Sequence, residues 1–349
     1  MEDDILRLAE SMQCQELHMV LDEPTGLRAI IAIHNTVLGP ALGGCRFLEY
    51  PSTYVAVQDA IRLARGMTYK AAISNLPLGG GKAVLLKPKR MLDRVEYFRA
   101  FGRFLNTLNG RYITAVDSGT STADMDAIAL ETQHVTNTTT HKLFSLADPS
   151  PLTAEGVVCG MRAAVKFKLK KDNLKGVRVL VQGLGHVGFS LVEQLTALGA
   201  QLTVFDINPT AMSRAHVQFG AVLVNSLEEL LETEADVFAP CALGAILNDH
   251  NIPKLRVPIV AGAANNQLLE NRHGEMLAGA GILYAPDYVI NAGGLIYVAD
   301  QYAHTTEAES REKVHAIYDT MMEIFRRSEK EKKSTNSIAD AIVLEKLKQ

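Results

Sequence analysis

The sequence has few cysteines, no long apolar run and no large excess of charge. Its cysteines, Cys14, Cys45, Cys159 and Cys241, are far apart and form no CxxC pair, so neither a zinc site nor a disulfide framework is indicated. No stretch approaches the roughly 18 apolar residues of a membrane-spanning helix. The net charge of −4 is small for 349 residues and does not indicate a nucleic-acid surface. We therefore expect no metal centre, no nucleic-acid partner and no membrane partner.

The composition is that of an ordinary globular protein. Hydrophobic residues make up 47% of the chain and charged residues 21%, and the length of 349 residues fits about two domains. The first residues, Met1-Glu2-Asp3-Asp4, are acidic and lack the basic and apolar regions of a signal peptide. We expect a soluble, cytoplasmic protein.

The spacing of apolar residues predicts two α/β regions. Residues 27–34 read as a strand and residues 56–67 as a helix. Residues 147–153 contain two prolines and are interpreted as a domain boundary. Beyond it, candidate strands alternate with helices, which is typical of a parallel, doubly wound sheet. These strands are expected at 177–182, 202–206, 221–224, 236–240, 257–261 and 281–285.

A glycine-rich turn follows the first of these strands. The segment Gly183-Leu184-Gly185-His186-Val187-Gly188 stands between a valine-rich strand and an apolar-periodic helix, as a dinucleotide-binding turn requires. Its glycines would allow a tight turn, close approach of a pyrophosphate and helix–sheet contact. Asp206 ends the next strand, where an acidic residue binds the adenosine ribose. Because a carboxylate repels a 2′-phosphate, we predict NAD rather than NADP; a turn without ligand is the alternative.

Two lysines, Lys70 and Lys82, lie among glycines and apolar residues rather than in a solvent-facing pattern. The run Gly79–Gly81 is not a phosphate-binding loop, because Leu76 stands at the first glycine position and Ala83 replaces the magnesium-binding hydroxyl. We interpret these glycines as letting the backbone pass close to a small substrate. Burial and a neighbouring cation lower a lysine pKa, so one lysine could act as general base while the other holds a carboxylate. Two surface lysines are the alternative.

A carboxylate, Asp117, follows a short apolar run and precedes a Gly-Thr pair. Strand ends of this kind often present side chains to a cleft, although a turn-capping carboxylate is the alternative. Asp124 and Asp126 are rival candidates. They stand in the first turn of a helix expected to start near Thr122, which favours a capping role for them.

Together these segments resemble the Glu/Leu/Phe/Val amino-acid dehydrogenase superfamily, most closely its leucine dehydrogenase branch. The matching segments are 38–46, 66–70, 78–82, 112–126, 150–153, 183–188, 239–244, 261–266 and 286–294. The resemblance implies two α/β domains separated by a cleft. Residues 1–147 would form the substrate and oligomerisation domain, to which a helix at about 328–349 returns. Residues 148–327 would form a Rossmann-type, doubly wound NAD-binding domain.

The resemblance also implies a reaction. An L-amino acid, NAD and water would give the 2-oxo acid, ammonium and NADH, reversibly, in a homo-oligomer. Lys70 would bind the substrate carboxylate, Lys82 would be the general base that activates water, and Asp117 would exchange protons with the substrate nitrogen. Gly43 and Gly44 would line the site with backbone.

For the cofactor, the resemblance adds residues that the pattern alone does not indicate. Thr153, Asn265 and Asn291 would hold the nicotinamide and its ribose, and Asn265 would also lie near the substrate. The turn residues Gly183, Leu184, Gly185, His186, Val187 and Gly188, with Asp206, would complete the cofactor contacts.

The implied side-chain pocket is apolar. Its lining would be Leu42, Ala115, Leu295 and Val298, which favours an aliphatic branched-chain substrate (Leu, Val or Ile) over glutamate. One methylene is worth only about 1–3 kcal/mol, so these three substrates are not separated.

Two alternatives to this function stay open. Residues 29–34 and Pro77 also resemble tryptophan dehydrogenases, so the same chemistry on an aromatic amino acid is the first. A non-catalytic NAD-binding relative is the second. It would have lost Lys82 or Asp117, and both are present.

Overall fold

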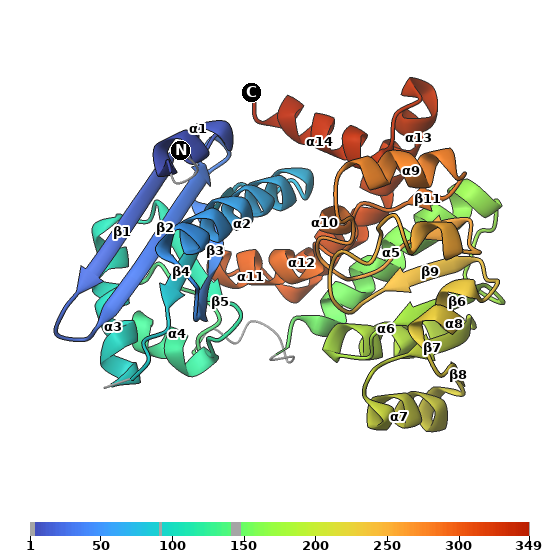
Figure 1. Ribbon diagram of the computed structural model, residues 1–349, viewed down its shortest axis with the longest axis horizontal. Coiled ribbons are helices and arrows are strands. Elements are labelled where there is room, and N and C mark those ends of the chain that lie inside the picture. Colours follow the sequence, from blue (N-terminus) through green and yellow to red (C-terminus); the bar gives the residue numbers. More distant parts are fainter. Residues whose placement is uncertain (1–3, 91–92, 141–147, 349) are drawn as a thin grey trace. The chain divides into compact units, whose positions relative to one another are not determined.

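The structure, a computed structural model, describes residues 4–90, 93–140 and 148–348 (Figure 1). The chain divides into two compact units, and both are α/β, as predicted. The first unit holds residues 1–147, 298–307 and 346–349, and the second unit holds residues 148–297 and 308–345. Among the described residues, no helix is both long enough and apolar enough to cross a membrane.

The first unit is built on a mixed five-stranded sheet in the order β1-β2-β4-β3-β5. The strands are β1 (Glu16–Asp22), β2 (Leu27–Asn35), β3 (Ala41–Leu48), β4 (Gly79–Leu86) and β5 (Tyr112–Val116). β1, β2 and β4 pair antiparallel, whereas β4, β3 and β5 run parallel. The strand that carries Lys82 and the strand that leads to Asp117 therefore flank the same middle strand, β3.

Helices cover both faces of this sheet. α2 (Thr53–Ile73) packs on one face against a cluster that includes Val84, and α1 (Ile5–Ser11) extends that cluster. α3 (Arg94–Thr107) and α4 (Thr122–Ala129) pack on the other face. Because alternate residues of a strand point to the same face, Lys82, two residues before Val84, lies on the α2 face.

The second unit contains a parallel six-stranded sheet in the order β11-β10-β9-β6-β7-β8. Its strands are β6 (Arg178–Gln182), β7 (Gln201–Phe205), β8 (Val222–Leu223), β9 (Val237–Pro240), β10 (Ile259–Val260) and β11 (Leu283–Tyr284). Counted from β6, this is the strand order of doubly wound dinucleotide-binding sheets. All six strands expected from the alternating pattern are confirmed, three of them as two-residue strands.

The remaining helices follow in chain order. They are α5 (Ser150–Leu169), α6 (His186–Ala197), α7 (Pro209–Phe219), α8 (Leu227–Glu232), η1 (Ile252–Lys254), α9 (Arg272–Gly279), α10 (Asp287–Ile290), α11 (Gly293–Ala303), α12 (Glu307–His315), α13 (Ile317–Glu331) and α14 (Thr335–Lys346). The segment with two prolines that is interpreted as a domain boundary mostly belongs to α5, with Pro149 at the N-cap and Pro151 in the first turn. Proline is tolerated there because the first N–H groups of a helix lack partners within the helix.

Gly66, inside α2, offers a test of this packing. A Cβ at Gly66 would have nothing within 4 Å, whereas a Cβ at Gly80 would lie 2.0 Å from the backbone nitrogen of Thr68. Since glycine in a helix interior is about 0.5–1 kcal/mol worse than alanine, Gly66→Ala should raise the free energy of unfolding by about that amount. Gly80→Ala should lower it. Urea denaturation measures both, and a destabilised Gly66→Ala protein would contradict the open space at that position.

Candidate active site

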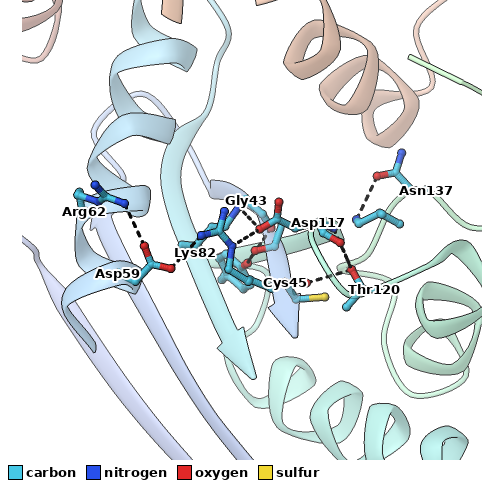
Figure 2. A network of polar contacts seen from close by, with 12 residues as sticks. Gly43, Cys45, Asp59, Arg62, Lys82, Asp117, Thr120 and Asn137 are labelled. Carbon is cyan, nitrogen blue, oxygen red and sulfur yellow. Dashed lines mark hydrogen bonds and ion pairs between the residues drawn. The ribbon is translucent and has the colours of Figure 1, made fainter. Parts of the chain in front are cut away.

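Lys82 and Asp117 lie together in the first unit. Lys82 stands on β4 and Asp117 directly follows β5, and Lys82 Nζ lies 2.7 Å from Asp117 Oδ2. Figure 2 shows the two side chains pointing toward each other. Lys82 is only 6% exposed, so the surface-lysine alternative is wrong for this residue. Without substrate the two groups form an ion pair.

A second cation contacts the same carboxylate oxygen. Arg46 Nε donates to Asp117 Oδ2 over 3.1 Å. Burial by itself would raise the pKa of Asp117, but Lys82 and Arg46 outweigh burial, and the pKa of Asp117 lies below its usual value. Asp117 is therefore a carboxylate at neutral pH.

The middle strand, β3, has glycine at the two positions, Gly43 and Gly44, that lie against β4 and Asp117. A Cβ on Gly44 would lie 2.7 Å from Asp117 Cβ, and a Cβ on Gly43 would lie 1.8 Å from the Gly81 carbonyl oxygen. Glycine at both positions lets β4 and Asp117 come close to β3. The Tyr112 hydroxyl, which donates to the Gly43 carbonyl over 2.7 Å, ties β5 to this part of β3.

The interpretation of the glycine run before Lys82 is wrong. The space beside each glycine is filled by protein, not left open for substrate. A Cβ would lie 1.9 Å from the Asn35 oxygen at Gly79, 2.0 Å from the Thr68 nitrogen at Gly80, and 2.7 Å from the Tyr112 ring at Gly81. These glycines instead let α2, β2 and β5 pack tightly round β4, which holds Lys82 deep in the sheet.

The other residues predicted to bind substrate lie in two places. Lys70 is half-buried in the last turn of α2, two residues after Thr68. Leu42 and Ala115 are buried on β3 and β5, and the pairing of Gly44 with Ala115 places both on the α2 face with Lys82. Leu295 and Val298 lie on α11. That these residues surround one substrate stays a prediction.

The rival carboxylates have structural partners. Asp124 forms a capping box with Ser121, which is the N-cap of α4 in place of the expected Thr122, and Arg94 Nε lies 2.7 Å from Asp124 Oδ1. Asp126 Oδ1 accepts a hydrogen bond from the Thr139 backbone over 2.8 Å. The capping role that the sequence favours is confirmed for Asp124, whereas Asp126 binds the backbone of the loop that contains Thr139.

The glycine turn of the second unit fits a pyrophosphate. Gly183 has a φ of +98°, and a Cβ there would lie 2.8 Å from Ala242 Cβ, so only glycine suits the turn. At Gly185 no atom of the described residues lies within 4 Å of a Cβ, which leaves the backbone open to a ligand. A Cβ at Gly188 would lie 2.0 Å from the Gly183 oxygen, because α6 packs directly on the turn. These are the three roles that a dinucleotide turn gives its glycines.

The glycine turn is flanked by the first residues of α6 and by Asp206, which directly follows β7. His186 and Val187 open α6, and the exposed His186 has Nδ1 3.5 Å from Asp148 Oδ2. The Leu184 backbone N–H donates to Asp206 Oδ2 over 2.6 Å, and the Asn208 N–H donates to Asp206 Oδ1 over 2.7 Å. Asp206 therefore holds the glycine turn as well as presenting a carboxylate beside it.

Three polar residues expected near the nicotinamide also lie in the second unit. Asn291 Nδ2 donates to Asn265 Oδ1 over 2.8 Å, whereas the buried Asn291 Oδ1 accepts no hydrogen bond from the described residues. An unpaired buried oxygen fits a ligand with N–H donors, such as a carboxamide. Thr153 is buried in the first turn of α5, and its Oγ1 would lie 2.9 Å from a Cβ on Gly294. Lone Thr and Asn residues carry no pattern, so only the family resemblance indicated them.

Comparisons with known proteins agree with both units. Residues 11–134 match the profile described as Glu/Leu/Phe/Val dehydrogenase, dimerisation domain, and residues 208–348 match Glutamate/Leucine/Phenylalanine/Valine dehydrogenase. The leucine dehydrogenase of Thermoactinomyces intermedius is 47% identical over 97% of this chain and 92% of its own length. The phenylalanine dehydrogenase of Caldalkalibacillus thermarum is 44% identical over 99% of this chain and 92% of its own.

A solved structure is similar over nearly the whole chain. The crystal structure of L-tryptophan dehydrogenase from Nostoc punctiforme has a TM-score of 0.88 at 41% identity and covers 98% of both chains. With the two profile matches and the relatives above, this likeness shows that the chain belongs to the Glu/Leu/Phe/Val dehydrogenase family and is an NAD(P)-dependent, leucine dehydrogenase-like amino-acid dehydrogenase.

Proposed function

We propose that this protein catalyses the reversible, NAD-dependent oxidative deamination of an aliphatic branched-chain L-amino acid to its 2-oxo acid and ammonium. The observation that carries the proposal is the ion pair formed by the buried Lys82 and the half-buried Asp117, with Nζ 2.7 Å from Oδ2. The pair stands in a chain that is 47% identical to a leucine dehydrogenase. Paired acid and base groups of this kind are what proton transfer to and from a substrate requires.

In this proposal each polar group has one task. Lys70 binds the substrate carboxylate through its ammonium. Asp117 is a carboxylate in the free enzyme, and it takes a proton from the substrate nitrogen. Lys82, once it has released its own proton to solvent, removes a proton from the water that attacks the imino carbon. The oxygen of that water becomes the oxo group, and the nitrogen leaves as ammonium.

The residues of the second unit would hold NAD, which when bound accepts the hydride from the substrate Cα. The turn at 183–188 would bind the pyrophosphate, and Thr153, Asn265 and Asn291 would bind the nicotinamide side. Asp206 supports NAD rather than NADP, because its carboxylate repels a 2′-phosphate. The backbone N–H groups of Leu184 and Asn208 occupy its two oxygens and hold it beside the turn.

The substrate preference follows from the proposed apolar pocket and is tested by a panel of amino acids. With L-Leu, L-Val, L-Ile, L-Phe and L-Trp, we expect kcat/KM to be higher for each aliphatic substrate than for either aromatic one. NADH absorbance follows the reaction. A highest kcat/KM for L-Phe or L-Trp would instead favour the aromatic function, which the likeness to L-tryptophan and phenylalanine dehydrogenases keeps as the second candidate.

We further infer that the protein acts as a homo-oligomer. The match of residues 11–134 to a dimerisation domain supports this inference. Light scattering after gel filtration should give a mass that is a multiple of the 38.0 kDa chain. A mass of one chain at assay concentration would contradict it.

A further inference from the structure

One arginine joins the proposed reaction centre to helix α2. Arg46, on β3, donates from Nε to Asp117 Oδ2 over 3.1 Å and from a terminal nitrogen to Asp59 Oδ2 over 2.9 Å. Its side chain is only 21% exposed. The guanidinium therefore bridges two carboxylates that belong to different elements of the first unit.

Asp59 is itself held firmly on α2. The Tyr50 hydroxyl donates to Asp59 Oδ2 over 2.7 Å, and Arg62 donates to Asp59 Oδ1 over 3.3 Å. The Asp59 side chain is 12% exposed, whereas that of Arg62 is 65% exposed. Figure 2 shows Asp59 on the helix side of the network and Asp117 on the opposite side of Lys82. Arg46 is thus fixed at both ends by partly buried anions.

The two cations on Asp117 differ in chemistry. The lysine ammonium can lose its proton and must do so if Lys82 is the base, whereas an arginine guanidinium stays charged at all working pH values. If Lys82 alone balanced Asp117, the carboxylate would lose its counter-charge at the step that uses it. Arg46 supplies a charge that does not change during the reaction.

We propose that Arg46 is a positioning residue of this reaction, which keeps Asp117 oriented, and ionised in the free enzyme, whichever protonation state Lys82 has, and that Asp59 anchors Arg46 for this task. The inference rests on the proposed roles of Lys82 and Asp117. Arg46 acts through Asp117 and is not assigned any contact with the substrate.

The other ionisable groups that face Asp117 do not compete for this role. Cys45 on β3 and Tyr112 on β5 are both buried, which raises the pKa of Cys45 to about 12 and that of Tyr112 well above its usual value. Both stay neutral at working pH. Lys82 from β4 and Arg46 from β3 are therefore the charges that act on Asp117 directly, with Asp59 acting through Arg46.

The test is the pH profile of kcat/KM for Arg46→Gln. Removing an opposite charge at hydrogen-bond distance raises a carboxyl pKa, by roughly 1–3 units for close pairs, so the acid limb should move to higher pH by at least about one unit. Arg62→Gln is the matched control, because Arg62 contacts Asp59 but not Asp117, and its profile should match the wild type. Arg46→Lys should recover only part of kcat, since an ammonium lacks the fork that bridges two carboxylates.

Asp59→Asn keeps the inference testable if Arg46→Gln does not fold. This change removes an anion and leaves the Arg46 charge beside Asp117, so the acid limb should move to lower pH. Acid limbs that stay at the wild-type position in Arg46→Gln and in Asp59→Asn, where these variants fold, would overturn the role of Arg46.

Asp117→Asn distinguishes a failure of the proposed function from a failure of the inference about Arg46. If Asp117→Asn keeps wild-type turnover, the proposed function of Asp117 fails; if it is inactive while the limbs do not move, only the inference about Arg46 fails.

Discussion

Lys82→Ala is expected to lower kcat by about 10²–10⁴-fold, the range that a general base contributes, while leaving the affinity for NAD unchanged. The fold should survive, because Asp117 keeps Arg46 as a counter-charge 3.1 Å away. Steady-state NADH formation and a fluorescence titration with NAD measure the two quantities separately.

The exposed Lys87, directly after β4, provides the control for Lys82. Lys87→Ala removes a lysine charge just beyond the end of the same strand, away from Asp117, and it should behave as wild type. A Lys82→Ala enzyme with wild-type kcat would reject Lys82 as the base.

Asp206→Ala should weaken NAD binding by about 10–100-fold. Hydrogen bonds to a charged group are worth about 1.5–3 kcal/mol, and 1.4 kcal/mol corresponds to a factor of ten. The substitution would remove two interactions. Asp206 would contact the ribose, and it also holds the glycine turn by accepting a hydrogen bond from the Leu184 N–H over 2.6 Å.

Asp206→Asn separates these two contributions. An asparagine oxygen can still accept from Leu184, so the turn should hold, but the negative charge that excludes a 2′-phosphate is gone. Calorimetric titrations with NAD and NADP should show a smaller loss of NAD affinity than in Asp206→Ala, together with a gain for NADP. An unchanged NAD affinity in Asp206→Ala would contradict the ribose assignment.

Much of the fold could be predicted because its signals are local. The strand–glycine–helix–acid order from Val177 to Asp206 lies in one short stretch of sequence, and each part has a spacing that sequence reveals. The reason for a glycine cannot be predicted in this way, because the sequence does not reveal whether a ligand or a neighbouring strand fills the space beside it. The sequence alone therefore suggests substrate beside Gly79–Gly81, although protein atoms lie there.

The network of Arg46, Asp59 and Asp117 at the proposed reaction centre has no local signal in the sequence. Arg46 lies 13 residues from Asp59 and 71 residues from Asp117 in sequence, and only the pairing of β3 with β5 and the packing of α2 bring the three together. Asn291, a lone polar residue, is indicated only by the family resemblance, and the structure distinguishes it by a buried oxygen that accepts no hydrogen bond within the described part of the chain.

The place of β3 between the two reacting side chains has a consequence for heat inactivation. Lys82 stands on β4, which pairs with β2 and β3, whereas Asp117 follows β5, which is an edge strand of the sheet and pairs with β3. Separation of β5 from β3 would therefore move Asp117 away from Lys82 before the whole unit melts, and the amides of β3 should exchange more slowly than those of β5. The half-life of activity at high temperature would then report an early loosening at β5 rather than cooperative unfolding of the unit.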